Sequence, residues 1–83
     1  MNKNKYEIFF TTDNTQFRLY INSINCGTCS IDDTYECKRN MYRFITDSFN
    51  KLNIEPKHSK VLTVIRKIWN TYRWNGLMED KNG

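Results

Sequence analysis

The sequence has no alanine, one proline, one histidine and only three glycines among its 83 residues. Without a stretch rich in Gly, Ser or Pro there is no linker to divide the chain, so we expect one domain with one core. The chain also lacks the run of about 20 apolar residues that a membrane-spanning helix needs. The basic N-terminus is not followed by the apolar segment of a signal peptide, so we expect a cytoplasmic protein.

Charge is distributed unevenly along the chain. Its 13 Lys and Arg residues outnumber 9 Asp and Glu residues, which gives a formal net charge of +4. Residues 1–33 carry 3 basic and 4 acidic side chains, whereas residues 34–83 carry 10 basic and 5 acidic ones. A basic half on one folded domain is typical of a protein with an anionic macromolecular partner.

The N-terminal part of the chain alternates apolar and polar residues with a period of two, which predicts β-strands. The alternating apolar positions are Tyr6, Ile8 and Phe10, then Phe17, Leu19 and Ile21. Between them, the Thr-Asp-Asn-Thr sequence of residues 12–15 is typical of a tight turn. We expect a β-hairpin over about residues 5–22, with an open edge through which a second copy could pair to form a homodimer.

The segment that follows is polar, and we interpret residues 23–33 as a loop that contains two of the three cysteines. Its last part offers Ser30, Asp32 and Asp33 as caps for a helix over about residues 34–53. That helix has one apolar stripe at helical spacing, formed by Cys37, Met41, Phe44, Ile45, Phe49 and Leu52.

A second helix is predicted over about residues 60–75, after Glu55-Pro56 and with Ser59 as its cap. Its apolar stripe comprises Val61, Leu62, Ile65, Ile68, Trp69 and Tyr72. Residues 61–65 also have strand propensity, but the stripe is longer than a usual strand. Asn75-Gly76 would end the helix, and a polar tail over residues 79–83 would follow. The predicted fold is a small α+β domain of the ββαα type, a hairpin packed on two amphipathic helices.

The cysteines allow a structural zinc site as one hypothesis. Cys26-Gly-Thr-Cys29 has the spacing of half a zinc knuckle, and Cys37 with His58 would complete a set of four ligands. The alternative interpretation is three reduced thiols, with Cys37 acting as a small hydrophobic residue of its helix. A thioredoxin-like redox role is a third interpretation, but the adjacent Asp32-Asp33 would raise a thiol pKa when catalysis needs it lowered.

No constellation of residues predicts an enzyme. The three glycines are scattered, so there is no phosphate-binding loop. Lys57 and Ser59, the two neighbours of His58 in the sequence, do not indicate a site for nucleophilic catalysis. A helix-turn-helix interpretation of the last two elements lacks the usual third helix and a tight turn.

Basic and aromatic residues offer a candidate binding surface. The candidates are Arg66, Lys67, Arg73 and Trp74 from the second helix, with Lys38, Arg39 and Arg43 from the first. Cations next to an exposed aromatic ring suit contact with phosphates and bases, and they suit a protein interface equally well. Arg18 and Tyr20, on the outer face of the second strand, could extend this surface.

In its format the chain resembles the small proteins of phages and mobile elements, including inhibitors of the anti-CRISPR type. The shared features are the 83-residue length, one domain, an Asn- and Lys-rich composition and no catalytic constellation. The resemblance implies a stoichiometric inhibitor that docks on a host nucleic-acid-handling protein or ribonucleoprotein without chemistry. The alternative hypothesis is a module that binds RNA or DNA directly, stabilised by a structural zinc.

Overall fold

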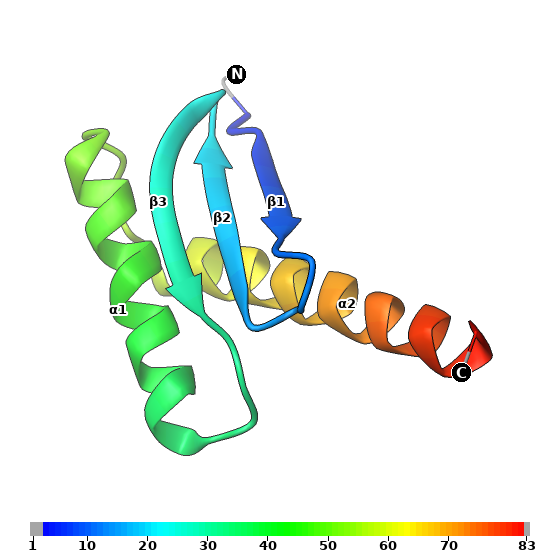
Figure 1. Ribbon diagram of the computed structural model, residues 1–83. Coiled ribbons are helices and arrows are strands. Elements are labelled where there is room, and N and C mark those ends of the chain that lie inside the picture. The colour runs from blue at the N-terminus through cyan, green and yellow to red at the C-terminus, as the bar shows by residue number, and fades with distance from the viewer. Residues whose placement is uncertain (1–2, 83) are drawn as a thin grey trace.

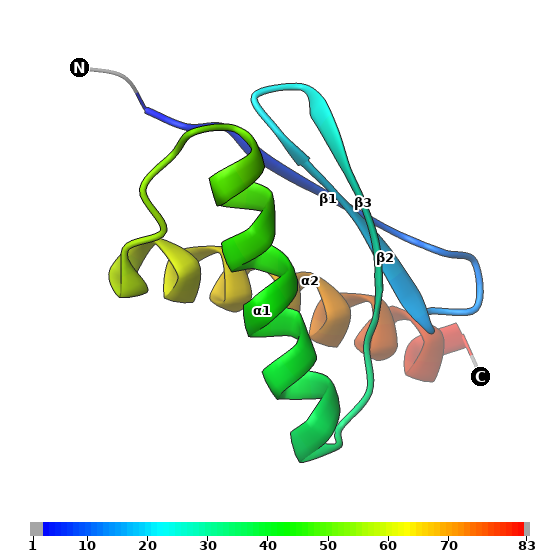
Figure 2. The same cartoon turned by 90° about the vertical axis from the view of Figure 1, so that its left-hand side faces the viewer.

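The computed structural model describes the backbone of residues 3–82 and the side chains of residues 3–73. Within residues 3–82, three strands are followed by two helices: β1 (Tyr6–Phe10), β2 (Gln16–Ile21), β3 (Ile24–Ser30), α1 (Tyr35–Lys51) and α2 (His58–Asn82). The strands form an antiparallel sheet in the order β1-β2-β3, and both helices lie on one side of it (Figures 1 and 2). The α+β fold with an N-terminal hairpin and two helices is confirmed.

The hairpin of β1 and β2 has the predicted alternation. Ile8 lies opposite Leu19 and Phe10 lies opposite Phe17, so both pairs face the helices. In the turn, the Asp13 carboxylate accepts hydrogen bonds from the hydroxyl groups of Thr11 and Thr15, at 2.7 and 2.8 Å. These hydrogen bonds lower the pKa of Asp13 and hold the turn in place.

The third strand corrects the sequence analysis, which interpreted residues 23–33 as a loop. The register of β3 on β2 shifts by one residue beyond Arg18, so two residues of β3, Cys26 and Gly27, lie opposite Leu19. This is a β-bulge, and Gly27 takes the φ of 107° that it requires. The bulge breaks the period-two pattern, and for that reason the alternation of a strand is missing from the sequence here.

The N-terminus of α1 is capped by Thr34, not by Ser30 or the two aspartates. The Thr34 hydroxyl accepts a hydrogen bond from the Cys37 N–H at 3.1 Å and donates one to the Asp32 carboxylate. Asp32 therefore supports the cap from outside the helix, and this hydrogen bond lowers its pKa. The helix covers almost the predicted range.

The C-terminus of α1 is closed by Asn53, which has a φ of 58°. Its N–H donates to the Asn50 carbonyl, and the Ile54 N–H donates to the Phe49 carbonyl. These two hydrogen bonds form a Schellman motif, in which asparagine replaces the usual glycine. The chain then turns before Pro56 and enters α2.

The second helix is longer than predicted at both ends. It begins at His58, which places Ser59 inside the helix and not at its cap. It continues through Asn75-Gly76 as far as Asn82, where the sequence analysis expected a stop and a polar tail. A glycine inside a helix costs only about 1 kcal/mol relative to alanine, which is not enough to end it. The C-terminal turns extend past the sheet (Figure 1).

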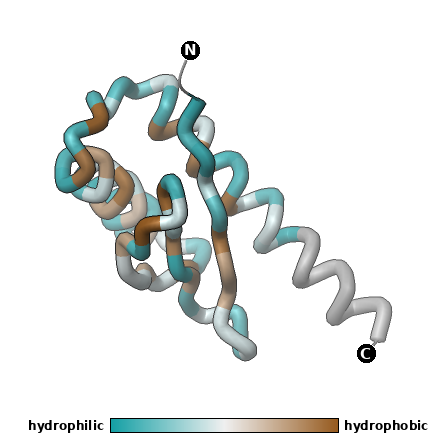
Figure 3. The backbone as a smooth tube through the Cα atoms, turned by 90° about the horizontal axis from the view of Figure 1, so that it is seen from above, coloured by the Kyte–Doolittle hydropathy of each residue, from teal (hydrophilic) through white to brown (hydrophobic). Residues whose placement is uncertain are grey.

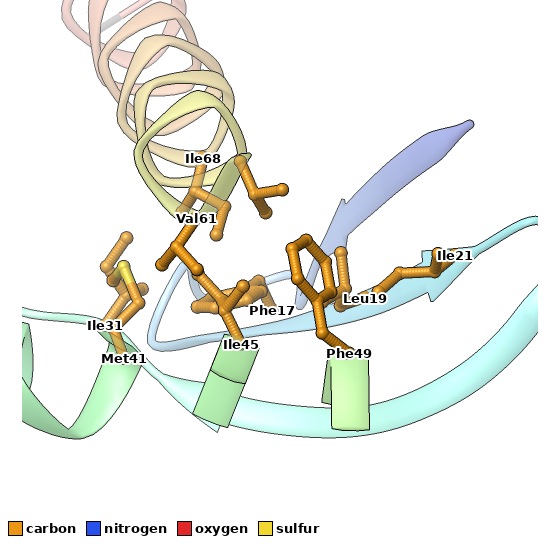
Figure 4. Packing of buried hydrophobic residues seen from close by; sticks show 10 residues of the cluster. Phe17, Leu19, Ile21, Ile31, Met41, Ile45, Phe49, Val61 and Ile68 are labelled. Carbon is orange, nitrogen blue, oxygen red and sulfur yellow. The ribbon is translucent and has the colours of Figure 1, made fainter. Parts of the chain in front are cut away.

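The core lies between the sheet and the two helices (Figure 4). Its fully buried side chains include Phe17, Leu19 and Ile21 of β2, Met41, Ile45 and Phe49 of α1, and Val61, Val64 and Ile68 of α2. Hydrophobic and hydrophilic positions alternate along the chain, as expected for amphipathic elements around one core (Figure 3). None of the helices, over the residues described, is both long and apolar enough to cross a membrane.

Candidate binding surface between the two helices

The N-terminal half of α1 meets the middle of α2 through one cation and one aromatic ring. The Lys38 ammonium group lies 5.9 Å from the centroid of the Trp69 ring. The same ammonium group lies 4.0 Å from a carboxylate oxygen of Asp33. Asp33 is 99% exposed and Lys38 is 53% exposed, so this ion pair is weak and leaves the lysine available to another anion.

A hollow of about 480 Å³ opens beside this contact, lined by Asp33, Lys38, Trp69, Tyr72 and Arg73. The rings of Trp69 and Tyr72 meet edge to face, with their centroids 5.5 Å apart. Tyr72 in turn packs against Phe10 of β1, which fixes the aromatic part of the hollow to the sheet. The hollow therefore combines a rigid aromatic wall with two cations, one from each helix.

The surface continues onto the first turns of α1. Tyr35 is 76% exposed, and the Arg39 guanidinium lies 5.9 Å from the centroid of its ring. We name the combination of Tyr35, Lys38, Arg39, Trp69, Tyr72 and Arg73 the helix-side surface. Of its three cations, Lys38 and Arg73 line the hollow together with Asp33, and Arg39 lies against the exposed ring of Tyr35.

The seven predicted binding residues are distributed as follows. Lys38 and Arg73 are brought together at the hollow, whereas Arg39 lies against the Tyr35 ring and does not line the hollow. Arg66 is exposed two turns before Arg73, and Arg43 is exposed one turn after Arg39. Lys67 lies on another side of α2, where it is bonded to β1. The side chain of Trp74 lies outside the residues described.

Three aromatic residues of the helix-side surface were not predicted as site residues. Trp69 and Tyr72 belong to the apolar stripe of α2, and their half-buried rings form part of both the core boundary and the hollow. Tyr35 stands before the stripe of α1, and its spacing of four residues from Arg39 was the available signal. Arg18 and Tyr20 do not extend this surface, because they lie on the opposite face of the sheet.

The bulge in β3 brings the Cys26 and Cys29 side chains to the same, core-facing side of the sheet. Cys37 is buried and donates a hydrogen bond from Sγ to the Ser30 carbonyl at 3.2 Å. Burial raises the pKa of Cys29 to about 11, with a contribution from neighbouring Cys37, and burial also raises the pKa of Cys37. Both thiols are therefore protonated at neutral pH, which is the opposite of what a thiolate nucleophile needs.

The four candidate zinc ligands do not form a cluster. Cys26, Cys29 and Cys37 lie near the sheet, whereas the His58 ring at the start of α2 pairs with the Tyr42 hydroxyl, 2.7 Å from Nδ1. Over the part of the chain that the structure describes, no group of three His, Cys, Asp or Glu side chains is placed to hold a metal ion. The geometry gives no support to the zinc-knuckle hypothesis.

Comparison of the chain with protein-family models, with curated proteins and with solved structures finds no match.

Proposed function

We propose that this protein is a non-enzymatic binding protein that attaches to an acidic macromolecular partner through the helix-side surface. The observation that carries the proposal is the hollow between the helices, where Lys38 and Arg73 flank the rings of Trp69 and Tyr72. The partner that we propose is a cytoplasmic nucleic-acid-handling protein or ribonucleoprotein. The mode of action that we propose is stoichiometric inhibition, as the resemblance in format implies.

The physical basis is a division of roles between charge and aromatic surface. Exposed cations attract an acidic partner over distances of about 10 Å at moderate salt, and they accelerate association more than they increase final affinity. Rigid aromatic side chains then supply the contact area, because Trp, Tyr and Arg are the residues most enriched at binding hot spots. Both kinds of residue are present here within one hollow and its rim.

The test is affinity capture from extract of the host cells, with a charge-reversed variant for comparison. The double variant Lys38→Glu, Arg73→Glu reverses both cations of the hollow. The control Lys51→Glu, Lys57→Glu makes the same change in net charge at two exposed lysines, one at the C-terminal end of α1 and one just before α2. Captured proteins and nucleic acids are identified by mass spectrometry and sequencing, with and without nuclease treatment.

The proposal expects a partner that is captured by the wild type and the control and lost with the hollow variant. Capture that survives nuclease treatment identifies a direct protein contact. Equal capture by the two double variants contradicts the proposal, because the helix-side surface would then not be the attachment site. Capture that disappears completely after nuclease treatment also contradicts it, because the contact would then be with nucleic acid alone.

A further inference from the structure

The face of the sheet that points away from both helices is not covered by any described element (Figure 2). Strand register places Phe9 of β1 opposite Arg18 of β2, and Arg18 opposite Thr28 of β3, on this outer face. Phe9, in the edge strand β1, is 56% exposed. More than half of the ring therefore stays accessible to a ligand, next to the Tyr20 ring with which it is in contact.

Two aromatic rings and one guanidinium group stand together on this face. The Phe9 and Tyr20 rings meet edge to face at 85°, with centroids 5.6 Å apart. A hollow of about 220 Å³ lies next to them, and its lining includes Phe9, Arg18, Tyr20 and Thr28. We name Phe9, Arg18 and Tyr20, with Thr28, the sheet platform. The T-shaped contact holds the two rings in place without stacking their faces on each other.

We propose that the sheet platform binds single-stranded nucleic acid, with an unpaired base stacked on Phe9 or Tyr20 and a backbone phosphate paired with Arg18. A flat sheet with exposed rings is a surface on which unpaired bases stack, because every base has an aromatic face. Arginine presents a planar set of donors that matches phosphate geometry. The Thr28 hydroxyl offers a hydrogen-bonding group for a base edge at the same hollow.

The charges and the distribution of apolar groups favour this occupant over a protein or a second copy. The core of a stable protein interface is depleted of charge and continuously apolar. Here Arg18 lies directly beside Phe9, and Glu7 lies opposite Tyr20, so the apolar area is interrupted. A pair of exposed rings bordered by polar and cationic groups, as Phe9 and Tyr20 are here, instead suits the stacking of unpaired bases. Glu7 is an acidic residue on this face, and its carboxylate would repel a phosphate. Replacing Glu7 therefore tests whether the ligand is negatively charged.

The experiment measures fluorescence anisotropy of labelled oligouridylate and oligothymidylate, each about 12 nucleotides long, at low salt. A duplex of the same length serves as the comparison probe. The variants are Phe9→Ala, Phe9→Leu, Arg18→Gln and Glu7→Gln. The matched control is Ile24→Ala, which removes an equally exposed apolar side chain, 50% exposed, at the start of β3.

The proposal expects both single strands to bind more tightly than the duplex, with affinity that falls as salt rises. It expects Phe9→Ala and Phe9→Leu each to weaken binding about tenfold, since stacking one base contributes about that factor. Arg18→Gln should also weaken binding, Glu7→Gln should strengthen it, and Ile24→Ala should leave it unchanged. Circular dichroism of each variant establishes that the fold is retained.

Several outcomes would overturn the proposal. One is the absence of binding by the wild type to either single strand, and another is equal binding by Phe9→Ala and Ile24→Ala. A third is binding that is lost with Lys38→Glu, Arg73→Glu but kept with Phe9→Leu, because nucleic acid would then use the helix-side surface. A protein captured through Phe9, with no oligonucleotide binding, would assign the platform to a protein partner. The capture experiment on the helix-side surface is independent of these results.

Discussion

The Lys67 ammonium group in α2 donates a hydrogen bond to the main-chain carbonyl oxygen of Tyr6 in β1, at 2.7 Å. The carbonyl of the preceding residue, Lys5, accepts from the Asn22 N–H and so points toward β2. Neighbouring carbonyls of a strand point to opposite sides, so the Tyr6 carbonyl points to the open edge of the sheet. Lys67 thus ties α2 to an edge strand and occupies one of the main-chain acceptors at that edge. This position separates Lys67 from the helix-side surface.

Replacing Lys67 by methionine should therefore reduce stability. The variant loses one long-range hydrogen bond, which contributes about 1 kcal/mol, and the melting temperature should fall by about 4–8 °C for a domain of this size. Thermal denaturation followed by circular dichroism measures the change. Arg66→Met is the control, since it removes a neighbouring exposed cation on another side of α2. A melting temperature for Lys67→Met equal to that of Arg66→Met would contradict the structural role.

Gly27→Ala should destabilise the protein through its backbone and not through steric overlap. The nearest atom to an added Cβ is Cε1 of Phe44 at 3.8 Å, an ordinary contact. The φ of 107°, however, is one that residues with a side chain rarely adopt, and we expect a loss of about 1–3 kcal/mol in the free energy of unfolding. Urea denaturation checks this. Thr28→Ala, at the next position of β3, should change stability much less, and similar losses in the two variants would argue against a strained bulge.

The contrast between the hairpin and β3 shows what the sequence can reveal. The hairpin was predictable because its alternation is regular and its turn residues are typical. In β3 the bulge at Gly27 puts Cys26 and Cys29 on one face despite their spacing of three, so a motif that resembles a metal-binding loop is a strand with an irregular register. The predicted cap of α1 was one residue too early, because Asp32 bonds to the capping residue Thr34 and not to the helix directly.

For the candidate surface, the sequence indicated which cations could take part but not which of them lie together in the fold. Helical spacing placed Arg66 and Arg73 on one side of α2, but the approach of Lys38 to Trp69 depends on how the two helices cross. The bond from Lys67 to Tyr6 joins residues 61 positions apart, and no local pattern encodes it. Tertiary packing decides these relationships, and it is also the reason why the half-buried rings of Trp69 and Tyr72 line a hollow.

Stability should decrease in alkaline solution because of Cys29. Its pKa rises from 9.0 in an ordinary environment to about 11 in the fold, so the folded state binds the thiol proton more tightly than the unfolded state. The resulting contribution is fully present below about pH 9 and is lost as the pH rises toward 11. Urea denaturation across this range should show a shallower decrease for Cys29→Ser than for the wild type. Parallel pH profiles of the two proteins would contradict the assignment to Cys29.

The cap of α1 should make stability sensitive to acid. Thr34→Ala removes the hydroxyl that accepts from the Cys37 N–H and should cost about 1 kcal/mol at neutral pH. Asp32 has a lowered pKa in the fold, so its contribution is present above its ordinary value of 3.8 and is lost as the pH falls below it. The wild type should therefore lose more stability on acidification than Asp32→Asn. Asp33→Asn is the control, and an identical acid response of the two asparagine variants would refute the role of Asp32.

Two phenylalanines of the hairpin should lose very different amounts of stability on the same substitution, because they face opposite sides of the sheet. Phe17 is fully buried, and its ring lies 6.0 Å from those of Phe10 and Phe44, so Phe17→Ala should cost about 3–5 kcal/mol. A domain of this size has only about 4–12 kcal/mol in total, so Phe17→Leu provides a milder second variant. Phe9→Ala should cost about 1 kcal/mol, because the ring is 56% exposed and its contact with the Tyr20 ring lies at the surface. Urea denaturation of the three variants measures this order, and a Phe9→Ala loss as large as that of Phe17→Leu would mean that the ring supports the fold and is not held free for a ligand.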